Sequence, residues 1–450
     1  MLRLTLYGIV HQASDHQHRC RFERNRYLMM IKSKWNAFYC GIFLIIVISQ
    51  VAYAGDNWPS FRGPKNDGIS DARELPVEWS ESKNIKWKTA IHDLGFSTPV
   101  VWENQIWVTT ATEEGHKLYA VCVDFESGKI IHDKLLYEVE NPQRKHPLNS
   151  YATPSPVIEA GRVYVHFGSD GTACLDTKSS NILWSREDLK CTHWSGPGSS
   201  PFMYKHLLIL HLEGKDFQYI IALDKKNGKT IWKTDRPKEL YEKTIPLYRK
   251  GFSTPIITLI DGKDQLISVG AQTSHAYDPM TGDEIWYVYY GTDSTVSCPI
   301  SDGELVFFNT GIQRPSPELW AVLPTGSGNV TESHLAWKII EHVPNESSPI
   351  IMNGLIYMVS DQGKVSCFDA KTGQIIWQED LKGQFSASPV YAAGRIYFSN
   401  KKGETTVISE GKLFGVLSSN KIDEGFIASP AIKGNSLIMR TKTHLYRISE

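Results

Sequence analysis

The chain has 450 residues, of which 41% are hydrophobic and 22% charged, and its formal net charge is −1 at pH 7. This near-neutral balance gives no sign of a nucleic-acid partner, since such a partner needs a clustered excess of Lys and Arg. Seven cysteines are present, but a core of this size does not need disulfide bonds.

Residues 1–54 are predicted to be a leader. Residues 37–54 are almost continuously apolar, follow Lys32 and Lys34, and end in Ala52-Tyr53-Ala54. This pattern is typical of a secretory signal peptide, here at about 30–54, with a small-residue cleavage site. If the segment is not cleaved, it is long enough to stay as an N-terminal signal anchor, which would then be the only membrane contact. We therefore expect a periplasmic or secreted protein of the bacterial cell envelope.

The leader holds seven basic and two acidic residues, so the remainder has a net charge of −6. Residues 55–83 are expected to form an extended segment. From residue 84 to 450 the chain repeats itself. A small residue next to a proline, followed by apolar residues, recurs eight times at intervals of 40 to 57 residues, with the prolines at Pro99, Pro156, Pro201, Pro255, Pro299, Pro349, Pro389 and Pro430. Such a period predicts an array of supersecondary units.

The unit at 346–381 is the clearest. Four short runs rich in β-formers, at 348–351, 355–359, 364–369 and 374–377, are separated by turns that contain Asn353-Gly354, Gly363 and Gly373. Two-residue turns with glycine are typical of β-hairpins. Four strands in about forty residues leave no room for a helix, so each unit is predicted to be a four-stranded antiparallel blade of a β-propeller.

An aspartate precedes a tryptophan by eight residues in several units. We interpret each tryptophan as a ring that covers the outer strand of its blade and docks on the next blade. The docking residues predicted in this way, together with one from the N-terminal strand, are Trp87, Trp184, Trp232, Trp286 and Trp377.

The last repeat is short of one strand. Residues 429–448 supply three strands, and the chain then ends, while Asn84–Lys88 resembles a fourth strand without a repeat around it. Pairing of the two would close the ring. The predicted fold is therefore an all-β, eight-bladed propeller closed by an N-terminal strand.

With the repeat, the turns and the tryptophans, the chain resembles the pyrroloquinoline-quinone-type (quinoprotein-like) β-propeller superfamily over residues 84–450. The segment Trp58–Pro64 resembles the opening of secreted bacterial members described as similar to the outer-membrane assembly lipoprotein BamB. The superfamily contains quinone-dependent dehydrogenases and non-catalytic scaffolds, so the resemblance implies a fold and leaves the activity open.

The resemblance implies specific features for a dehydrogenase. Such enzymes stack pyrroloquinoline quinone (PQQ) between a tryptophan and a ring formed by two adjacent cysteines, bind calcium through side-chain oxygens, and use an aspartate as base. The chain has no Cys-Cys pair. Its repeat aspartates are better explained as turn-formers that accept backbone N–H groups. No cofactor is therefore expected, and PQQ with calcium is the alternative.

One stretch outside the repeat, residues 191–198, combines a cysteine, a histidine and a tryptophan at a crossing between blades. Candidate ligand-binding residues there and at the preceding crossing are Asn149, Tyr151, His166, Cys191, His193 and Trp194. A metal site needs three or four ligands, and Cys-x-His alone is a weak signal. The competing interpretation is a loop braced by Trp194 with a hydrogen-bonded His193.

A full set of structural motifs without an identifiable catalytic set favours a non-catalytic protein. We expect a scaffold that binds envelope proteins. The alternatives are a PQQ-dependent alcohol or sugar dehydrogenase with an atypical site around Cys191, His193 and Trp194, and a carbohydrate-binding module.

Overall fold

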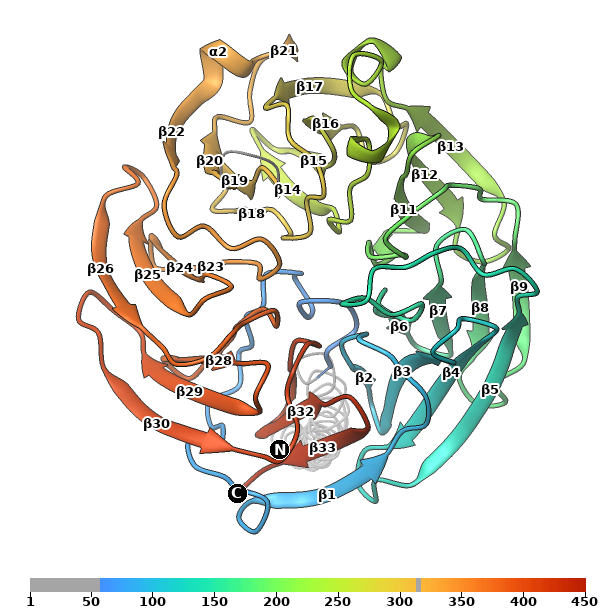
Figure 1. Cartoon of the computed structure of the whole chain (residues 1–450), viewed down its shortest axis with the longest axis vertical. Helices are drawn as coiled ribbons and strands as arrows, with labels where there is room; N and C mark the ends of the chain where they lie inside the picture. The colour runs from blue at the N-terminus through green and yellow to red at the C-terminus, as the bar shows by residue number, and fades with distance from the viewer. Residues whose placement is uncertain (1–56, 313–316) are drawn as a thin grey trace, which may run out of the picture. The chain divides into compact units, whose positions relative to one another are not determined.

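The computed structural model describes residues 57–312 and 317–450, and Asp56–Glu450 form one compact unit. Eight sheets, each built on four antiparallel strands, surround a central axis as blades (Figure 1). The predicted all-β, eight-bladed propeller is confirmed. The leader predicted over residues 1–54 lies outside the described residues.

The first four blades follow one another along the chain. The first blade contains β2 (Val100–Trp102), β3 (Gln105–Ala111), β4 (Lys117–Asp124) and β5 (Ile130–Glu138). The second contains β6 (Val157–Glu159), β7 (Arg162–His166), β8 (Thr172–Asp176) and β9 (Ile182–Arg186). The third contains β10 (Phe202–Tyr204), β11 (Leu207–Glu213), β12 (Gln218–Asp224) and β13 (Thr230–Asp235). The fourth contains β14 (Ile256–Ile260), β15 (Lys263–Val269), β16 (Thr273–Tyr277) and β17 (Glu284–Tyr289).

The other four blades complete the ring. The fifth contains β18 (Ile300–Ser301), β19 (Val306–Asn309), β20 (Leu319–Val322) and β22 (Leu335–Ile339). The sixth contains β23 (Ile350–Met352), β24 (Leu355–Val359), β25 (Lys364–Asp369) and β26 (Ile375–Asp380). The seventh contains β27 (Val390–Ala392), β28 (Arg395–Ser399), β29 (Glu404–Ser409) and β30 (Val416–Lys421). The eighth contains β31 (Ala431–Lys433), β32 (Ser436–Arg440), β33 (His444–Ile448) and β1 (Ile85–Ala90).

Helical structure among the described residues is limited to single turns. The 3-10 turns η1 (Lys238–Leu240) and η2 (Pro246–Tyr248) lie between the third and fourth blades, and α2 (Thr331–His334) lies in the fifth. The fifth blade is the irregular one, as its insertion before Trp337 suggests. That insertion also forms β21 (Gly328–Asn329), which pairs in parallel with β17 of the neighbouring blade. No helix in the described ranges is long and apolar enough to cross a membrane.

The turns of the sixth blade explain why the repeat folds into hairpins. Asn353 and Gly354 have φ angles of 50° and 73°, which the tight turn between β23 and β24 requires. The carboxylate of Asp369 accepts the backbone N–H of Thr372 at 3.0 Å and its hydroxyl at 2.8 Å. The repeat aspartate thus stabilises the turn before the outer strand.

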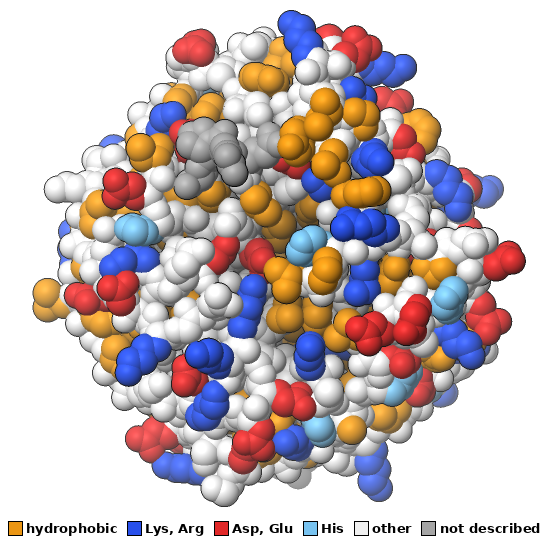
Figure 2. Space-filling view, viewed as in Figure 1, with side chains coloured by type: hydrophobic (Ala, Val, Ile, Leu, Met, Phe, Trp, Pro, Cys, Tyr) orange, Lys and Arg blue, Asp and Glu red, His pale blue; other side chains and the backbone are white. Residues whose placement is uncertain are grey.

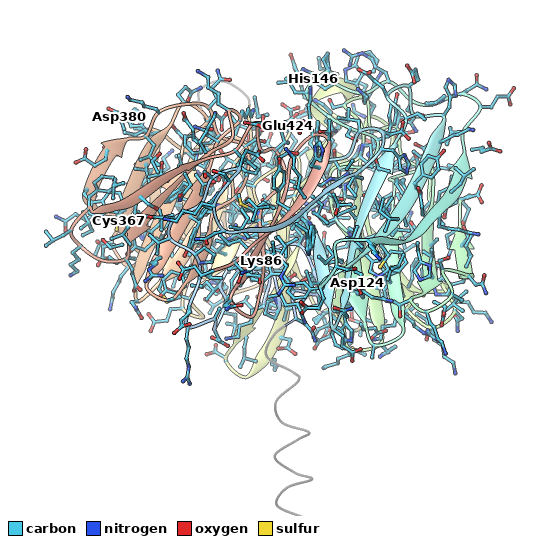
Figure 3. All side chains as sticks on the ribbon, turned by 90° about the horizontal axis from the view of Figure 1, so that it is seen from below. Lys86, Asp124, His146, Cys367, Asp380 and Glu424 are labelled. Carbon is cyan, nitrogen blue, oxygen red and sulfur yellow. The ribbon has the colours of Figure 1, made fainter. Side chains whose placement is uncertain are left out.

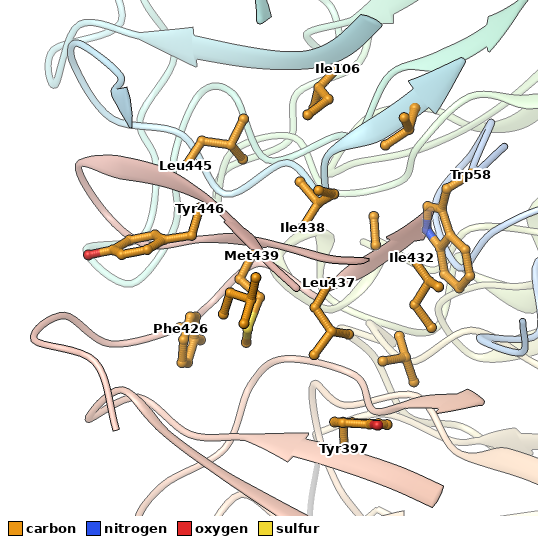
Figure 4. Close-up of a cluster of buried hydrophobic side chains, with 14 of the residues drawn as sticks. Trp58, Ile106, Tyr397, Phe426, Ile432, Leu437, Ile438, Met439, Leu445 and Tyr446 are labelled. Carbon is orange, nitrogen blue, oxygen red and sulfur yellow. The ribbon is translucent and has the colours of Figure 1, made fainter. Parts of the chain in front are cut away.

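The ring is closed by pairing of the two ends of the propeller, as predicted. Strand β1 lies antiparallel to β33, with Thr89 opposite Leu445 and Ala90 opposite His444. The apolar cluster in Figure 4 includes Trp58 and residues of the first, seventh and eighth blades. The ring is therefore closed by backbone hydrogen bonds between β1 and β33 and by apolar packing of the eighth blade against the first and seventh blades.

The repeated Ser-Pro phrase has a physical role that the sequence did not reveal. Near the axis, the residue before proline in one blade donates its backbone N–H to the hydroxyl of the equivalent residue in the next blade. Six such links, of 2.8–2.9 Å, are Thr98 to Ser155, Ser155 to Ser200, Ser200 to Thr254, Cys298 to Ser348, Ser348 to Ser388, and Ser388 to Ser429. We call this set the hydroxyl belt.

The extended N-terminal segment crosses the central opening of the ring (Figure 1). Trp58 exchanges backbone hydrogen bonds of 2.9 and 2.8 Å with Val101 of the first blade. Further on, the buried Arg62 donates to the carbonyl of Pro349, in the sixth blade, at 2.6 Å. Later still, the N–H of Trp79 donates to the side chain of Asn420, in the seventh blade, at 2.8 Å. The segment therefore ties blades across the axis.

Candidate functional site: a central cavity

A cavity of about 610 Å³ opens at the centre of one face of the ring. It is lined by loops between blades, by residues of the hydroxyl belt and by Phe61 of the N-terminal segment. His146, which lines the cavity, lies at the upper face of the ring in Figure 3. Figure 2 shows this face, where hydrophobic side chains gather beside the central hollow with Lys and Arg among them. The volume is in the range of small-ligand pockets.

Two of the six candidate residues, Asn149 and Trp194, line the cavity. The amide of Asn149 is fully engaged. Its Nδ2 donates to the carbonyls of Ser195 and Pro197 at 2.8 and 3.1 Å, and its Oδ1 accepts the N–H of Ser150 at 2.8 Å. Asn149 therefore joins the loop at 139–150 to the loop at 191–198.

Gln143, which sequence reasoning missed, connects three of the other candidates, Tyr151, Cys191 and His193. Its backbone carbonyl accepts the hydroxyl of Tyr151 at 2.6 Å. Its side chain donates to the carbonyl of Cys191 at 3.1 Å and accepts the N–H of His193 at 3.0 Å. Only the polarity of the loop could have suggested this role, because Cys191 and His193 lie about fifty positions away from Gln143 in the chain.

The remaining candidates His166, Cys191 and His193 are buried rather than exposed to the cavity. Burial lowers the pKa of His166 to about 3 and that of His193 to about 4, so both rings are neutral at pH 7. The thiol of Cys191 lies 3.9 Å from Nδ1 of His193. Because burial raises the pKa of Cys191, its thiol is protonated at neutral pH.

His193 packs closely against Gly168. A Cβ atom placed on Gly168 would lie 2.4 Å from Nε2 of His193, and the φ angle of Gly168 is +63°. The Nε2 side of the His193 imidazole is therefore packed against Gly168 and leaves no room for a ligand there. Among the described residues, no group of three or more His, Cys, Asp or Glu side chains is placed to hold a metal ion.

Trp194 has an unusual backbone for a bulky residue, with a φ angle of +62°. Such a conformation costs on the order of 1–3 kcal/mol and is found most often at functional sites. The guanidinium of Arg144 and the ammonium of Lys215 each lie 4.4 Å from the centre of the indole ring. The ring is therefore held at the cavity by two cations, whose attraction to an aromatic face is favourable.

Another wall of the cavity comes from the insertion at 236–250, which contributes Leu247, Tyr248 and Lys250. A longer interval between Pro201 and Pro255 is its only sequence signal. The insertion is anchored by buried charges, since Nε of Arg236 lies 2.6 Å from Oε1 of Glu213, and both side chains are fully buried.

The Glu213 carboxylate has further partners. Nε2 of His211 lies 3.3 Å from Oε1, and the N–H of Ala271 donates to Oε2 at 2.6 Å. Burial alone would raise the pKa of Glu213, but Arg236 and His211 outweigh it and keep that pKa below its usual value. The carboxylate is therefore charged, and it stabilises the start of the insertion.

The charged residues of the cavity wall include two paired groups. Nζ of Lys250 lies 2.9 Å from Oδ2 of Asp293. Across the cavity, the carboxylate of Glu346 accepts the hydroxyl of Ser386 and lies 3.4 Å from Lys401. Both pairs are structural contacts between neighbouring loops.

Four of the five tryptophans assigned to docking contact the following blade. Their indole N–H groups donate to backbone carbonyls there at 2.9–3.1 Å, in the pairs Trp87 to Phe125, Trp184 to Lys225 and Trp377 to Gly411, and at 3.2 Å from Trp232 to Pro279. Trp286 is different, because it donates to Gln265 of its own blade at 2.9 Å. Gln265 in turn donates to the carbonyl of Pro324 in the next blade.

The cavity does not suit the PQQ and calcium of the alternative prediction. Calcium takes six to eight oxygen ligands, whereas Glu346 is the only carboxylate that lines the cavity among the described residues, and it is already paired. No adjacent cysteines are present, and cations already lie over the ring of Trp194. The residues of the cavity therefore do not fit this pair of cofactors.

Comparison with known proteins finds similarity to an assembly-factor family, a hydrolase and a dehydrogenase. A family model described as outer membrane protein assembly factor BamB matches residues 317–413. Tetrathionate hydrolase of Acidithiobacillus ferrooxidans is 22% identical over 301 residues, which cover 62% of this chain and 48% of that protein. A lanthanide-dependent methanol dehydrogenase of Methylacidiphilum fumariolicum is 25% identical over 236 residues, covering 46% of this chain and 35% of the dehydrogenase. The chain thus spans half or less of the length of these curated relatives.

Solved structures show the same fold at low identity. BamB from Moraxella catarrhalis superposes with a TM-score of 0.55 and 12% identity, covering 81% of this chain and 99% of BamB. The quinohemoprotein alcohol dehydrogenase from Comamonas testosteroni gives 0.59 and 11%, covering 87% and 80%. The repeat, the blades and these superpositions agree on an eight-bladed propeller fold, and within residues 317–413 the chain is similar to the family described as outer membrane protein assembly factor BamB.

Proposed function

We propose that this chain is an exported, non-catalytic propeller that binds other proteins at the cell envelope and acts as an assembly scaffold. The observation that carries the proposal is the apolar rim of the central cavity. Leu148, Ile312 and Tyr248 line the cavity and keep 65%, 48% and 36% of their surface exposed. Exposed apolar groups gathered around a concave site are typical of a surface that a partner covers.

Two further observations support the proposal. The family model that matches residues 317–413 is described as an outer membrane protein assembly factor. The leader at 1–54 has the pattern of an export signal, which would bring the propeller to the envelope. Rigid strands that present loops on a flat face also suit protein contacts.

The test is capture of a specific partner. The tagged full chain, expressed in its own host, is crosslinked in the envelope, and the captured proteins are identified. We expect a defined partner that is lost when the loop at 139–150 is replaced by a Gly-Ser linker. Replacing the exposed turn at 177–179 serves as the control. Failure to recover any partner, or equal capture by all variants, would contradict the proposal.

A second candidate function, a PQQ-dependent alcohol or sugar dehydrogenase, is favoured by the similarity to the methanol dehydrogenase of Methylacidiphilum fumariolicum. It is tested by adding PQQ with calcium, and PQQ with a lanthanide, to the purified chain. A saturable change in absorbance with dye reduction by alcohols would replace the scaffold proposal. A carbohydrate-binding role would instead appear as thermal stabilisation by a sugar without turnover.

A further inference from the structure

The mouth of the central cavity combines apolar side chains with cations that lack a carboxylate partner. Arg144 lines the cavity and lies over Trp194, and Lys215 lies over the same ring. Lys145, the neighbour of Arg144 in the chain, lies 5.8 Å from the ring centre of Tyr151, which does not itself line the cavity. No carboxylate of residues 57–312 or 317–450 is within ion-pair distance of these three cations. The Trp194 side of the cavity therefore carries cations that no described carboxylate pairs with directly.

Nearby acids are engaged elsewhere. Asp216 follows Lys215, but its carboxylate accepts the N–H and hydroxyl of Thr192 at 2.7 Å each and the N–H of Phe217 at 2.9 Å. Glu346, across the cavity, is bound to Ser386 and Lys401. The electrostatic preference of the mouth is thus for an anionic group beside Trp194.

The inner wall of the cavity is rich in hydrogen-bond donors. Ser155, Ser200, Thr254, Ser388 and Ser429 of the hydroxyl belt all line it. Each of these oxygens accepts a backbone N–H from the preceding blade. Because a hydroxyl also carries one proton to donate, the belt offers donors to a ligand rich in carbonyl and carboxylate oxygens.

An apolar body also has a place in the cavity. Phe252, Phe96 and Phe61 form part of the wall, and the lining residues Leu148 and Tyr248 are exposed. A small molecule buried inside the cavity does not account for the apolar surface that Leu148 and Tyr248 keep exposed. A peptide segment of a larger protein would cover both the cavity and its rim.

We propose that the central cavity receives an extended segment of a partner protein in which an aromatic or branched aliphatic side chain is flanked by carboxylates. The apolar side chain enters the cavity, the carboxylates lie beside Arg144 and Lys215, and the backbone carbonyls accept from the belt hydroxyls. This inference rests on the scaffold function proposed above and names the chemistry of the partner. It follows the general rule that apolar anchors supply affinity while complementary charge supplies specificity.

The first experiment pans a random linear peptide library on the immobilised full chain. We expect selected peptides to combine acidic residues with an aromatic or branched aliphatic residue, and their affinity to fall as salt is raised, because screening weakens exposed charge pairs. Selected peptides without acidic residues, or no enrichment at all, would overturn the proposal.

The second experiment measures the affinity of one selected peptide for matched variants. Trp194→Asn removes the ring while keeping a residue that tolerates a positive φ angle, and Arg144→Glu with Lys215→Glu reverses the charge. We expect each to weaken binding by roughly tenfold or more. The controls are Lys86→Glu, on a strand away from this face (Figure 3), and Leu413→Ser, an 85% exposed residue outside the cavity. Equal binding by site and control variants would overturn the proposal, and circular dichroism checks that all variants are folded.

The failure of this inference can be told from failure of the scaffold function. If the full chain still captures an envelope partner when Trp194→Asn and the charge reversals are introduced, the scaffold stands and the cavity assignment is wrong. If the chain forms a concentration-dependent dimer that the same variants abolish, the occupant is a second copy, which also overturns the assignment. If no partner is captured at all, the scaffold function fails, and the peptide data alone decide what the cavity recognises.

Discussion

Three histidine side chains, His166, His193 and His275, are enclosed in the propeller, and burial lowers their pKa values to about 3, 4 and 4. In an unfolded chain a histidine takes up a proton near pH 6.5. Between that pH and about 4, the unfolded state therefore binds more protons than the folded state. The free energy of unfolding should fall as the pH drops through this range, by about 1.4 kcal/mol per pH unit for each histidine.

The first prediction concerns His166→Gln, which keeps a polar group near Thr172 but removes one titrating ring. We expect the slope of unfolding free energy against pH, between pH 6 and 4, to decrease by about 1.4 kcal/mol per pH unit. Urea unfolding at several pH values measures this slope. Replacing the exposed His206 by Gln is the control, and a similar change in both variants would contradict the assignment to burial.

The second prediction concerns Glu213, whose carboxylate neutralises the buried Arg236. Glu213→Gln leaves that guanidinium enclosed without a counter-charge, and we expect a loss of about 3–5 kcal/mol in unfolding free energy. Chemical denaturation measures the loss. Glu78→Gln breaks a pair with Lys83 that is more than half exposed, and should leave the free energy of unfolding nearly unchanged, because solvent screens such a pair. Equal effects would mean that the buried pair does not anchor the insertion at 236–250.

At the scale of the blade, three docking tryptophans, Trp87, Trp184 and Trp232, pack against a glycine of the blade that receives them. A Cβ atom on Gly228 would lie 2.7 Å from the ring of Trp184, and Gly228 has a φ angle of +71°. Gly161 has nearly the same φ angle, +77°, but a Cβ atom added there would have no other atom within 4 Å. A substitution at Gly161 therefore tests backbone strain alone, whereas one at Gly228 tests backbone strain together with the contact between blades.

The third prediction compares Gly228→Ala with Gly161→Ala. Both should lose about 1 kcal/mol of stability to the left-handed backbone. Gly228→Ala should lose roughly 1–3 kcal/mol more, because the new methyl group pushes the indole ring off its site. Thermal unfolding measures both. If the two variants have the same melting temperature, the tryptophan contact contributes little to the stability of neighbouring blades.

Local patterns explain why the blades were predictable. Hairpin turns such as Asn353-Gly354 and the turn aspartate Asp369 act within a few residues, so their effect can be read from spacing. The hub role of Gln143 and the inter-blade bridge from Trp286 through Gln265 depend on residues that lie far apart in the chain. No periodic signal marks such contacts.

The same limit applies to the candidate site. The sequence singled out two residues that line the cavity, Asn149 and Trp194, because both lie in crossings that depart from the repeat. It did not separate them from His166, Cys191 and His193, which are buried by packing against other loops. Burial of this kind is decided by tertiary neighbours such as Gly168.

For the molecule as a whole, the junction between β1 and β33 is the place where the two ends of the propeller meet. A closed ring has no unpaired central edge, and opening this junction exposes strand edges on both sides. We therefore expect unfolding of the propeller to begin with separation of β1 from β33.

The fourth prediction tests this with a covalent link. Ala90 and His444 are paired across the junction, and Ala90→Cys with His444→Cys should form a disulfide under oxidising conditions. Because the bond closes almost the whole propeller, we expect a gain of up to about 5 kcal/mol, seen as a raised melting temperature that reductant reverses. Ala90→Cys alone is the control. A bond that forms without raising the melting temperature would place the weakest point elsewhere.

The six hydrogen bonds of the hydroxyl belt all run in one direction, from the N–H of an earlier blade to the oxygen of a later one. During synthesis, the acceptor oxygen of each of these hydrogen bonds is made after its N–H donor, because the acceptor lies later in the chain. At each of these six positions, a growing fragment carries one unmet donor at its last blade, and the next blade to emerge satisfies it. The order of translation and the order of assembly then coincide, and a nascent fragment has a built-in reason to add its blades in sequence.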